Sequence, residues 1–154
     1  MSAAHDAFPR ISGRSLDGER WQLPDDLPGP LNLIVAAFRR EQQALADEWL
    51  PWLLELARTH RRVAVYELPI LSSAFSPVRS FIDGGMARGV GTDEARARTI
   101  TVYTNVRKVV HALGLSGTDT IAVLLVARSG RILARELGGF DADAAGRIEA
   151  ALEA

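Results

Sequence analysis

The sequence contains no cysteine among its 154 residues. This absence excludes disulfide exchange and thiol-dependent peroxide reduction, because a thiolate is the nucleophile in both reactions. Any chemistry of this protein must therefore come from its other side chains.

Lysine is almost as scarce, and the charges nearly cancel. Lys108 is the only lysine, and the formal net charge is −1 at pH 7, so no overall field favours nucleic acid or an anionic membrane as a partner. The longest apolar run, Leu33–Phe38, is far shorter than the roughly 18–20 residues of a membrane-spanning helix. The first ten residues lack the basic region and the apolar core of a secretory signal. We therefore expect a soluble, cytoplasmic protein without membrane insertion or a nucleic-acid partner.

The length favours one domain over residues 1–154, with an N-terminal hairpin at about 8–24 and a core at about 31–154. Asp17-Gly18 lies between two short β-prone segments. This pair is typical of a tight type I′ hairpin turn, which needs positive φ at its central residues.

The next segments alternate between strand and helix patterns. Residues Leu31–Phe38 are apolar almost without interruption, as in a strand buried on both faces. The segment from Glu41 to about Thr59 carries apolar residues at spacings of three and four, which predicts a helix that Pro51 should kink. Val63–Ile70 has the pattern of a second strand, so the two strands should pair in parallel with a right-handed crossover.

The middle of the chain predicts short helices. Ser76-Pro77 is typical of a helix start, after which Val78, Phe81 and Ile82 should face inward. The glycine-rich stretch 84–91 predicts a flexible or tightly turned segment. Thr92 and Asn105 should begin two more helices, on either side of a β-prone segment at 99–104.

The last third predicts a hairpin of Ile121–Ala127 and Ile132–Leu137 at the sheet edge, followed by a helix from about Asp141. The whole order is β–α–β, a helical section, a β-hairpin and a final helix. This order resembles the thioredoxin-like arrangement. It predicts an α/β fold with a central mixed sheet of four to five strands flanked by helices.

Two landmarks locate the site that would carry thiols in such a fold. In thioredoxin-like reductases the first active-site cysteine lies five residues after a strand-ending Phe and eight before a kinking Pro. Phe38 and Pro51 both place that position at Gln43, with Ala46 at the second cysteine position. The segment that should hold the reductases' cis-proline, near Thr120-Ile121, contains no proline.

A second resemblance rests on segments that follow one another in a family's order: Phe38–Trp49, Tyr66–Ile70, Gly85–Gly89, Arg98–Tyr103 and Leu124–Ile132. Together they resemble the thioredoxin-related family that includes a mitochondrial ATP-synthase assembly chaperone, and its bacterial relatives. The resemblance implies a thioredoxin-like fold that binds proteins during assembly without thiol catalysis. It carries no catalytic residues, and the lack of a mitochondrial targeting region favours a bacterial-type relative with a partner of its own.

Six residues form the predicted interaction surface: Arg39, Arg40, Gln42, Gln43, Met86 and Arg88. The first four lie where the long strand ends and its helix begins. Ligands favour the carboxyl ends of strands in open α/β sheets, and helix N-termini attract anions. The glycine-rich stretch 85–91, with Met86 and Arg88, could close over what binds there.

Two functions follow from this surface. The first is a non-catalytic binding or assembly module with an unidentified protein partner. The alternative is a binder of small molecules or anions, or a thiol-independent enzyme, that uses the arginines of the same cleft. His5, His60 and His111 lack metal-ligand spacing, so we expect no metal and no cofactor.

Overall fold

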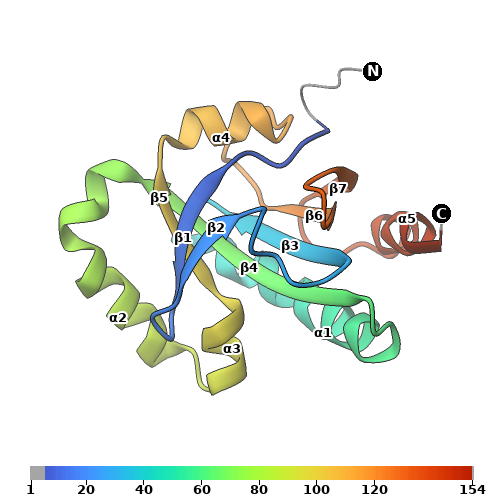
Figure 1. Cartoon of the computed structure of the whole chain (residues 1–154), viewed down its shortest axis with the longest axis horizontal. Helices are drawn as coiled ribbons and strands as arrows, with labels where there is room; N and C mark the ends of the chain where they lie inside the picture. The colour runs from blue at the N-terminus through green and yellow to red at the C-terminus, as the bar shows by residue number, and fades with distance from the viewer. Residues whose placement is uncertain (1–5, 154) are drawn as a thin grey trace.

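The computed structural model describes residues 6–153, in which a mixed β-sheet has helices on both faces (Figure 1). The strands are β1 (Ile11–Ser15), β2 (Arg20–Leu23), β3 (Leu31–Ala37), β4 (Val63–Ser72), β5 (Ile100–Thr104), β6 (Ala122–Ala127) and β7 (Ile132–Leu137). The α-helices are α1 (Gln43–Thr59), α2 (Arg79–Gly89), α3 (Asp93–Arg98), α4 (Val106–Ala112) and α5 (Ala142–Glu153). Two 3₁₀-helices, η2 (Arg40–Gln42) and η3 (Ser73–Val78), lead into α1 and α2.

The seven strands lie in the order β2-β1-β5-β4-β3-β6-β7. The predicted parallel pairing of the two long strands is confirmed, since β3 and β4 run in parallel from Leu31↔Val63 to Ala37↔Pro69. The prediction of four to five strands was too low. The N-terminal hairpin does not stand apart, because Arg14 of β1 pairs with Thr101 of β5 and so adds two strands to the same sheet.

The hairpin turn also differs from the predicted type I′ form. Gly18 has a φ of +97°, but no residue other than glycine has positive φ between residues 6 and 153. A type I′ turn needs positive φ at two central residues, so Asp17-Gly18 cannot form one. The chain uses a longer connection, in which the amide of Gly18 donates to the carbonyl of Ser15.

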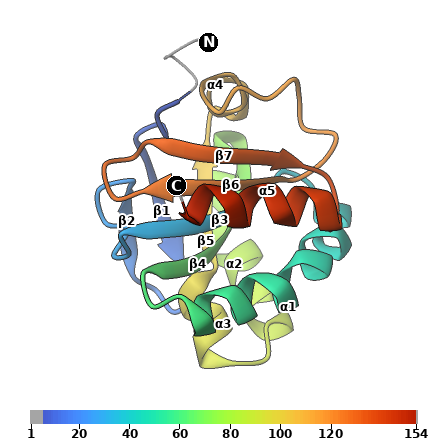
Figure 2. The same ribbon diagram turned by 90° about the vertical axis from the view of Figure 1, so that its right-hand side faces the viewer.

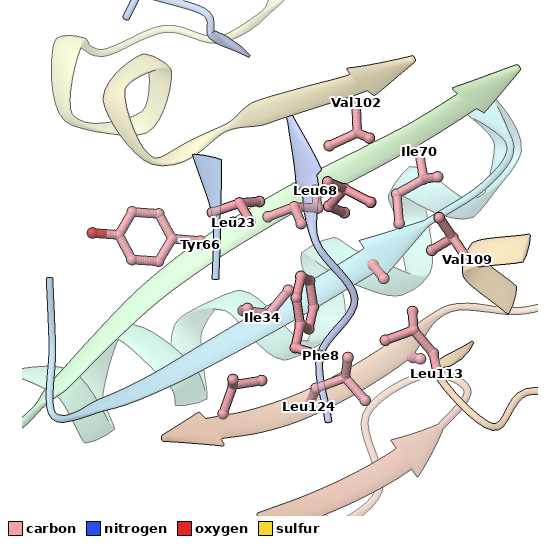
Figure 3. Close-up of a cluster of buried hydrophobic side chains, with 14 of the residues drawn as sticks. Phe8, Leu23, Ile34, Tyr66, Leu68, Ile70, Val102, Val109, Leu113 and Leu124 are labelled. Carbon is pink, nitrogen blue, oxygen red and sulfur yellow. The ribbon is translucent and has the colours of Figure 1, made fainter. Parts of the chain in front are cut away.

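Two apolar clusters fill the two faces of the sheet. Because successive strand residues point to opposite faces, β3 contributes Leu33 and Val35 to one cluster and Ile34 to the other. The first face is covered by α1 and α5, which lie in front of the sheet in Figure 2. The second is covered by α4 and by residues of the N-terminal segment, and Figure 3 shows Phe8 lying over Ile34 and Leu124. This confirms that β3 is buried on both faces.

The segment after β4 departs most from the sequence prediction. Val78 and Phe81 do not face inward, since 50% and 79% of their surfaces are exposed. The glycine-rich stretch is neither a turn nor a loop over most of its length, because Gly84, Gly85 and Gly89 lie within α2 and none has positive φ. Glycine only weakens a helix by about 1 kcal/mol relative to alanine, so contacts elsewhere can hold it in helical form.

No helix within residues 6–153 combines the length and the apolar character needed to cross a membrane.

Candidate functional site

The turn from β3 to α1 is built around the buried amide of Gln42. Its Oε1 accepts hydrogen bonds from the amides of Phe38 and Arg39 at 2.9 and 3.3 Å, and its Nε2 donates to the carbonyl of Thr118 at 2.6 Å. Both ends of the side chain are therefore used within the protein. Gln42 positions the turn and its neighbours, and it is not part of the exposed surface.

The two arginines of this turn are more exposed. The Arg39 Nη2 lies 3.2 Å from both Thr118 Oγ1 and Asp119 Oδ1, and 49% of its side chain remains exposed. Arg40 is exposed at the start of η2. The Arg39 charge is thus partly balanced by Asp119, although such an exposed pair contributes only about 0–1 kcal/mol to stability.

A carboxyl group that sequence reasoning did not single out lies near Gln43. Burial raises the pKa of Glu67 on β4, while the charge of Arg98 and a hydrogen bond from Gln43 lower it in part. Gln43 also donates to Asp47 at 2.9 Å, and the Asp47 charge acts to raise the same pKa. The only sequence signal for this cluster is an acidic residue inside an otherwise apolar strand.

Arg98 ends α3 close to this carboxyl group. Its Nε is buried and has no hydrogen-bond partner among the residues described. Gln43, at the predicted position of the first thiol, therefore has acidic and basic side chains near it rather than a redox pair.

The other two predicted surface residues, Met86 and Arg88, lie on α2. Met86 is half-buried, and the exposed Arg88 folds back beside Gly84. The six predicted residues thus lie in two regions, four in the turn from β3 through η2 to the start of α1 and two in α2.

The side of α2 that faces the sheet is polar. The Asp83 carboxylate accepts hydrogen bonds from Tyr103 Oη at 2.8 Å and Thr101 Oγ1 at 2.9 Å, and it lies 3.3 Å from Arg79 Nε. Arg79 Nη2 donates to the Thr101 carbonyl at 3.0 Å, and its guanidinium lies 4.5 Å from the centre of the Tyr103 ring. We refer to these four residues as the polar latch.

The opposite side of this segment is apolar and faces solvent. Phe75, Val78 and Phe81 are spaced by three residues across η3 and the start of α2, a spacing that places side chains on one helical face. All three are at least half exposed. We refer to them as the apolar row, which sequence reasoning missed because it assigned Val78 and Phe81 to the core.

The surface beside the Arg39 turn offers little room for a ligand. One hollow adjoins the turn that Arg39 contacts; Leu115, Asp119 and Leu137 are among its lining residues, and its volume is about 40 Å³. Ligand pockets commonly enclose roughly 300–1,000 Å³. Residues 6–153 contain no cluster of three or more metal-ligating side chains, and His5 lies outside that range.

Solved structures of several proteins resemble the whole chain. The thioredoxin domain of a thiol-disulfide oxidoreductase from Bacteroides vulgatus has a TM-score of 0.60 and 21% identity, over 97% of this chain and 98% of that one. An exposed lipoprotein thioredoxin from Streptococcus pneumoniae has a TM-score of 0.58 and 16% identity, over 95% and 100% of the two chains. The chain has a thioredoxin-like fold.

A third similar structure is BsSco, a member of the Sco family of cytochrome c oxidase assembly proteins. Its TM-score is 0.60 and its identity 10%, over 96% of this chain and 94% of that one. No family model and no curated protein matches the sequence. At these identities the similarity establishes the fold alone, and the absence of cysteine separates this thioredoxin-like protein from thiol chemistry.

Proposed function

We propose that this thioredoxin-like protein is a non-catalytic binding module whose partner is another protein. One observation carries the proposal: the segment of η3 and α2 turns the charged side chains of Arg79 and Asp83 toward the sheet and the apolar row toward solvent. Soluble monomers rarely expose large contiguous apolar patches, and the patches that they do expose commonly mark interaction sites.

The composition around the apolar row also supports a protein partner. The chain has no charged residue between Glu67 and Arg79, so Phe75 and Val78 lie in a neutral stretch of serine, alanine and proline. Cores of protein interfaces are enriched in aromatic residues and depleted of charge. Arg88 on α2, together with Arg39 and Arg40, is proposed as the charged surroundings of this surface, and Met86 on α2 as a further apolar side chain beside it.

We further propose that the module assists assembly of its partner. The support is the resemblance of five sequence segments to a family that includes an assembly chaperone. A protein of similar structure, BsSco, also belongs to a family of assembly proteins. Neither likeness identifies the partner of this chain.

The alternative is an anion binder at Arg39 and Arg40. It is favoured by the exposure of Arg40 and by the position of both arginines after a parallel strand. It is weakened by the ion pair of Arg39 with Asp119 and by the small volume of the adjoining hollow.

An affinity purification from the native host tests the proposal. Tagged wild-type protein is compared with a Val78→Ser/Phe81→Ser double variant and with Leu137→Ser, whose leucine on β7 is 53% exposed and serves as a matched control. A protein retained by the wild type and by Leu137→Ser, but lost from the double variant, supports binding through the apolar row. Equal retention by all three contradicts it.

Thermal melting of the wild type and of an Arg39→Ala/Arg40→Ala double variant, each with and without inorganic phosphate, tests the alternative. A ligand that binds only the native state raises the melting temperature by mass action. A rise with inorganic phosphate that disappears in the double arginine variant favours the anion binder. A wild-type melting temperature that does not change with phosphate argues against the anion binder.

A further inference from the structure

The attachment of α2 to the sheet is unlike that of three other helices. α1, α4 and α5 each bury apolar side chains, whereas α2 buries no residue. Its hydrogen bonds to the rest of the fold come from the polar latch and from Arg96 of α3, whose Nε donates to the Ala87 carbonyl at 3.0 Å. The position of this helix therefore depends on directional polar contacts.

Asp83 is the centre of the latch. Its two carboxylate oxygens are shared among Tyr103, Thr101 and Arg79, and only 16% of its side chain is exposed. Thr101 is fully buried, so its hydroxyl cannot replace the hydrogen bond to Asp83 with one to water while α2 is in place. Hydrogen bonds to a charged group in such surroundings are stronger than those between neutral groups.

We propose that Asp83 is a positioning residue for the apolar row. The polar latch holds η3 and α2 on β5 in one orientation, and its opening releases residues 73–89 locally while the rest of the fold stays intact. The role of the latch in presenting the apolar row to a partner rests on the proposed function. The local opening is a property of the isolated protein.

The physical reason for local release is the kind of contact that is lost. A helix without buried apolar side chains contributes little to either hydrophobic cluster, so its detachment exposes little core surface. Segments with few buried apolar contacts open at lower free energy than the whole protein. When the segment is latched, Phe75, Val78 and Phe81 are held ready for a partner, which reduces the entropy lost on binding.

Amide hydrogen exchange of the isolated protein tests the latch. The variants are Asp83→Asn, which removes the central charge, and Tyr103→Phe, which removes one hydroxyl and changes the packing least. Tyr66→Phe is the matched control, because it removes the hydroxyl of the other tyrosine from the opposite face of the sheet. Asp25→Asn is the control for charge, because it removes an exposed carboxylate that pairs with Arg10 rather than with a residue of α2 or α3.

The expected result is exchange that is faster by roughly tenfold in residues 79–89 of both latch variants. Exchange in β3, β6 and α1 should stay unchanged, and the two controls should match the wild type. Unchanged exchange in α2 of Asp83→Asn overturns the proposal, and so does an increase spread evenly over the whole chain. Hydrogen exchange needs no partner, so an affinity purification that retains no protein does not contradict the proposed role of Asp83. Conversely, unchanged exchange overturns the role of Asp83 but does not contradict binding through the apolar row.

Discussion

The hydroxyl of Tyr103 donates a hydrogen bond of 2.8 Å to the carboxylate of Asp83. This contact crosses from β5 to α2 and joins the sheet to the helix that carries part of the apolar row. Burial is the main cause that raises the pKa of Tyr103, and the hydrogen bond and the negative charge of Asp83 add to it. The nearby Arg79 charge acts in the opposite direction.

Both tyrosines should resist ionisation in the folded protein. Burial also raises the pKa of Tyr66, and the chain has no third tyrosine. The folded protein should therefore show no tyrosinate absorbance near pH 10, where an unperturbed tyrosine titrates. In denaturant both hydroxyls should ionise there. Tyrosinate formation near pH 10 in folded Tyr66→Phe, in which Tyr103 is the remaining tyrosine, would show that the latch is open in solution.

The same shifts make stability depend on alkaline pH. A phenol whose folded pKa lies above its unfolded value stabilises the protein fully below about pH 10, and this contribution is lost as the pH rises further. Tyr103→Phe should therefore reduce the alkaline loss of stability, as measured by urea unfolding above and below pH 10. An unchanged pH dependence would contradict the assignment.

Replacing Glu67 with glutamine should stabilise the protein at neutral pH. The folded-state pKa of Glu67 is raised, mainly by burial, so the native state holds its proton more tightly than the unfolded chain. The free energy of unfolding then falls as the pH rises through that pKa. Glu67→Gln removes this loss, and its advantage over the wild type should shrink toward acid pH, below the model-peptide value of about 4.3.

Glu55→Gln is the control of opposite sign. The hydrogen bond and charge of Arg58 lower the pKa of this exposed carboxyl. Urea unfolding from about pH 4 to 8 should therefore reveal no gain in stability at neutral pH for Glu55→Gln. If both variants behave alike, the Glu67 carboxyl is solvated and the cluster around Gln43 is not as described.

Loss of the Gln42 amide should destabilise the β3–α1 turn. Gln42→Ala leaves the buried amide of Phe38 without its acceptor and removes the bond to Thr118, which should cost about 1–3 kcal/mol of unfolding free energy. The neighbouring Gln43 is exposed, and Gln43→Ala should change stability by no more than about 0.5 kcal/mol. Equal effects in chemical denaturation would contradict the positioning role of Gln42.

Trp49 should be the more important of the two tryptophans in α1. It is fully buried, its Nε1 donates to the Gly138 carbonyl at 2.9 Å, and its ring packs edge-on against Phe140. Trp49→Ala should cost about 3–5 kcal/mol, and the half-buried Trp52 should cost less. Circular dichroism during urea unfolding compares the two without relying on tryptophan fluorescence.

The strand and helix order was predictable because apolar spacing is a local property. Leu31–Phe38 and Val63–Ile70 were recognised as strands, and the helix beginning after Asn105 follows the predicted cap. The number of strands was not predictable in the same way. Whether the hairpin joined the sheet depended on its pairing with β5, a contact between residues far apart in sequence.

The candidate site was predicted only in part. The chain pattern located the turn at Arg39 and Gln43, but it gave Gln42 an exposed role, although the backbone of residues 38, 39 and 118 uses that side chain. The surface at Arg39, Arg40, Met86 and Arg88 stays a prediction, as does the cytoplasmic location. Glu67 was not singled out, because the pKa of a carboxyl depends on burial and charges that three separate elements supply.

The sequence by itself determined two things about this protein. The absence of cysteine excluded thiol chemistry, and the alternation of apolar segments specified a thioredoxin-like order of elements. Only the tertiary structure decided which way α2 faces. Helical spacing places Val78 and Phe81 on one side of the segment, but it does not say what lies opposite. The adjacent face of β5 presents the hydroxyls of Thr101 and Tyr103, and buried hydroxyls need hydrogen-bond partners, so the charged side of α2 turns inward and the apolar row faces solvent.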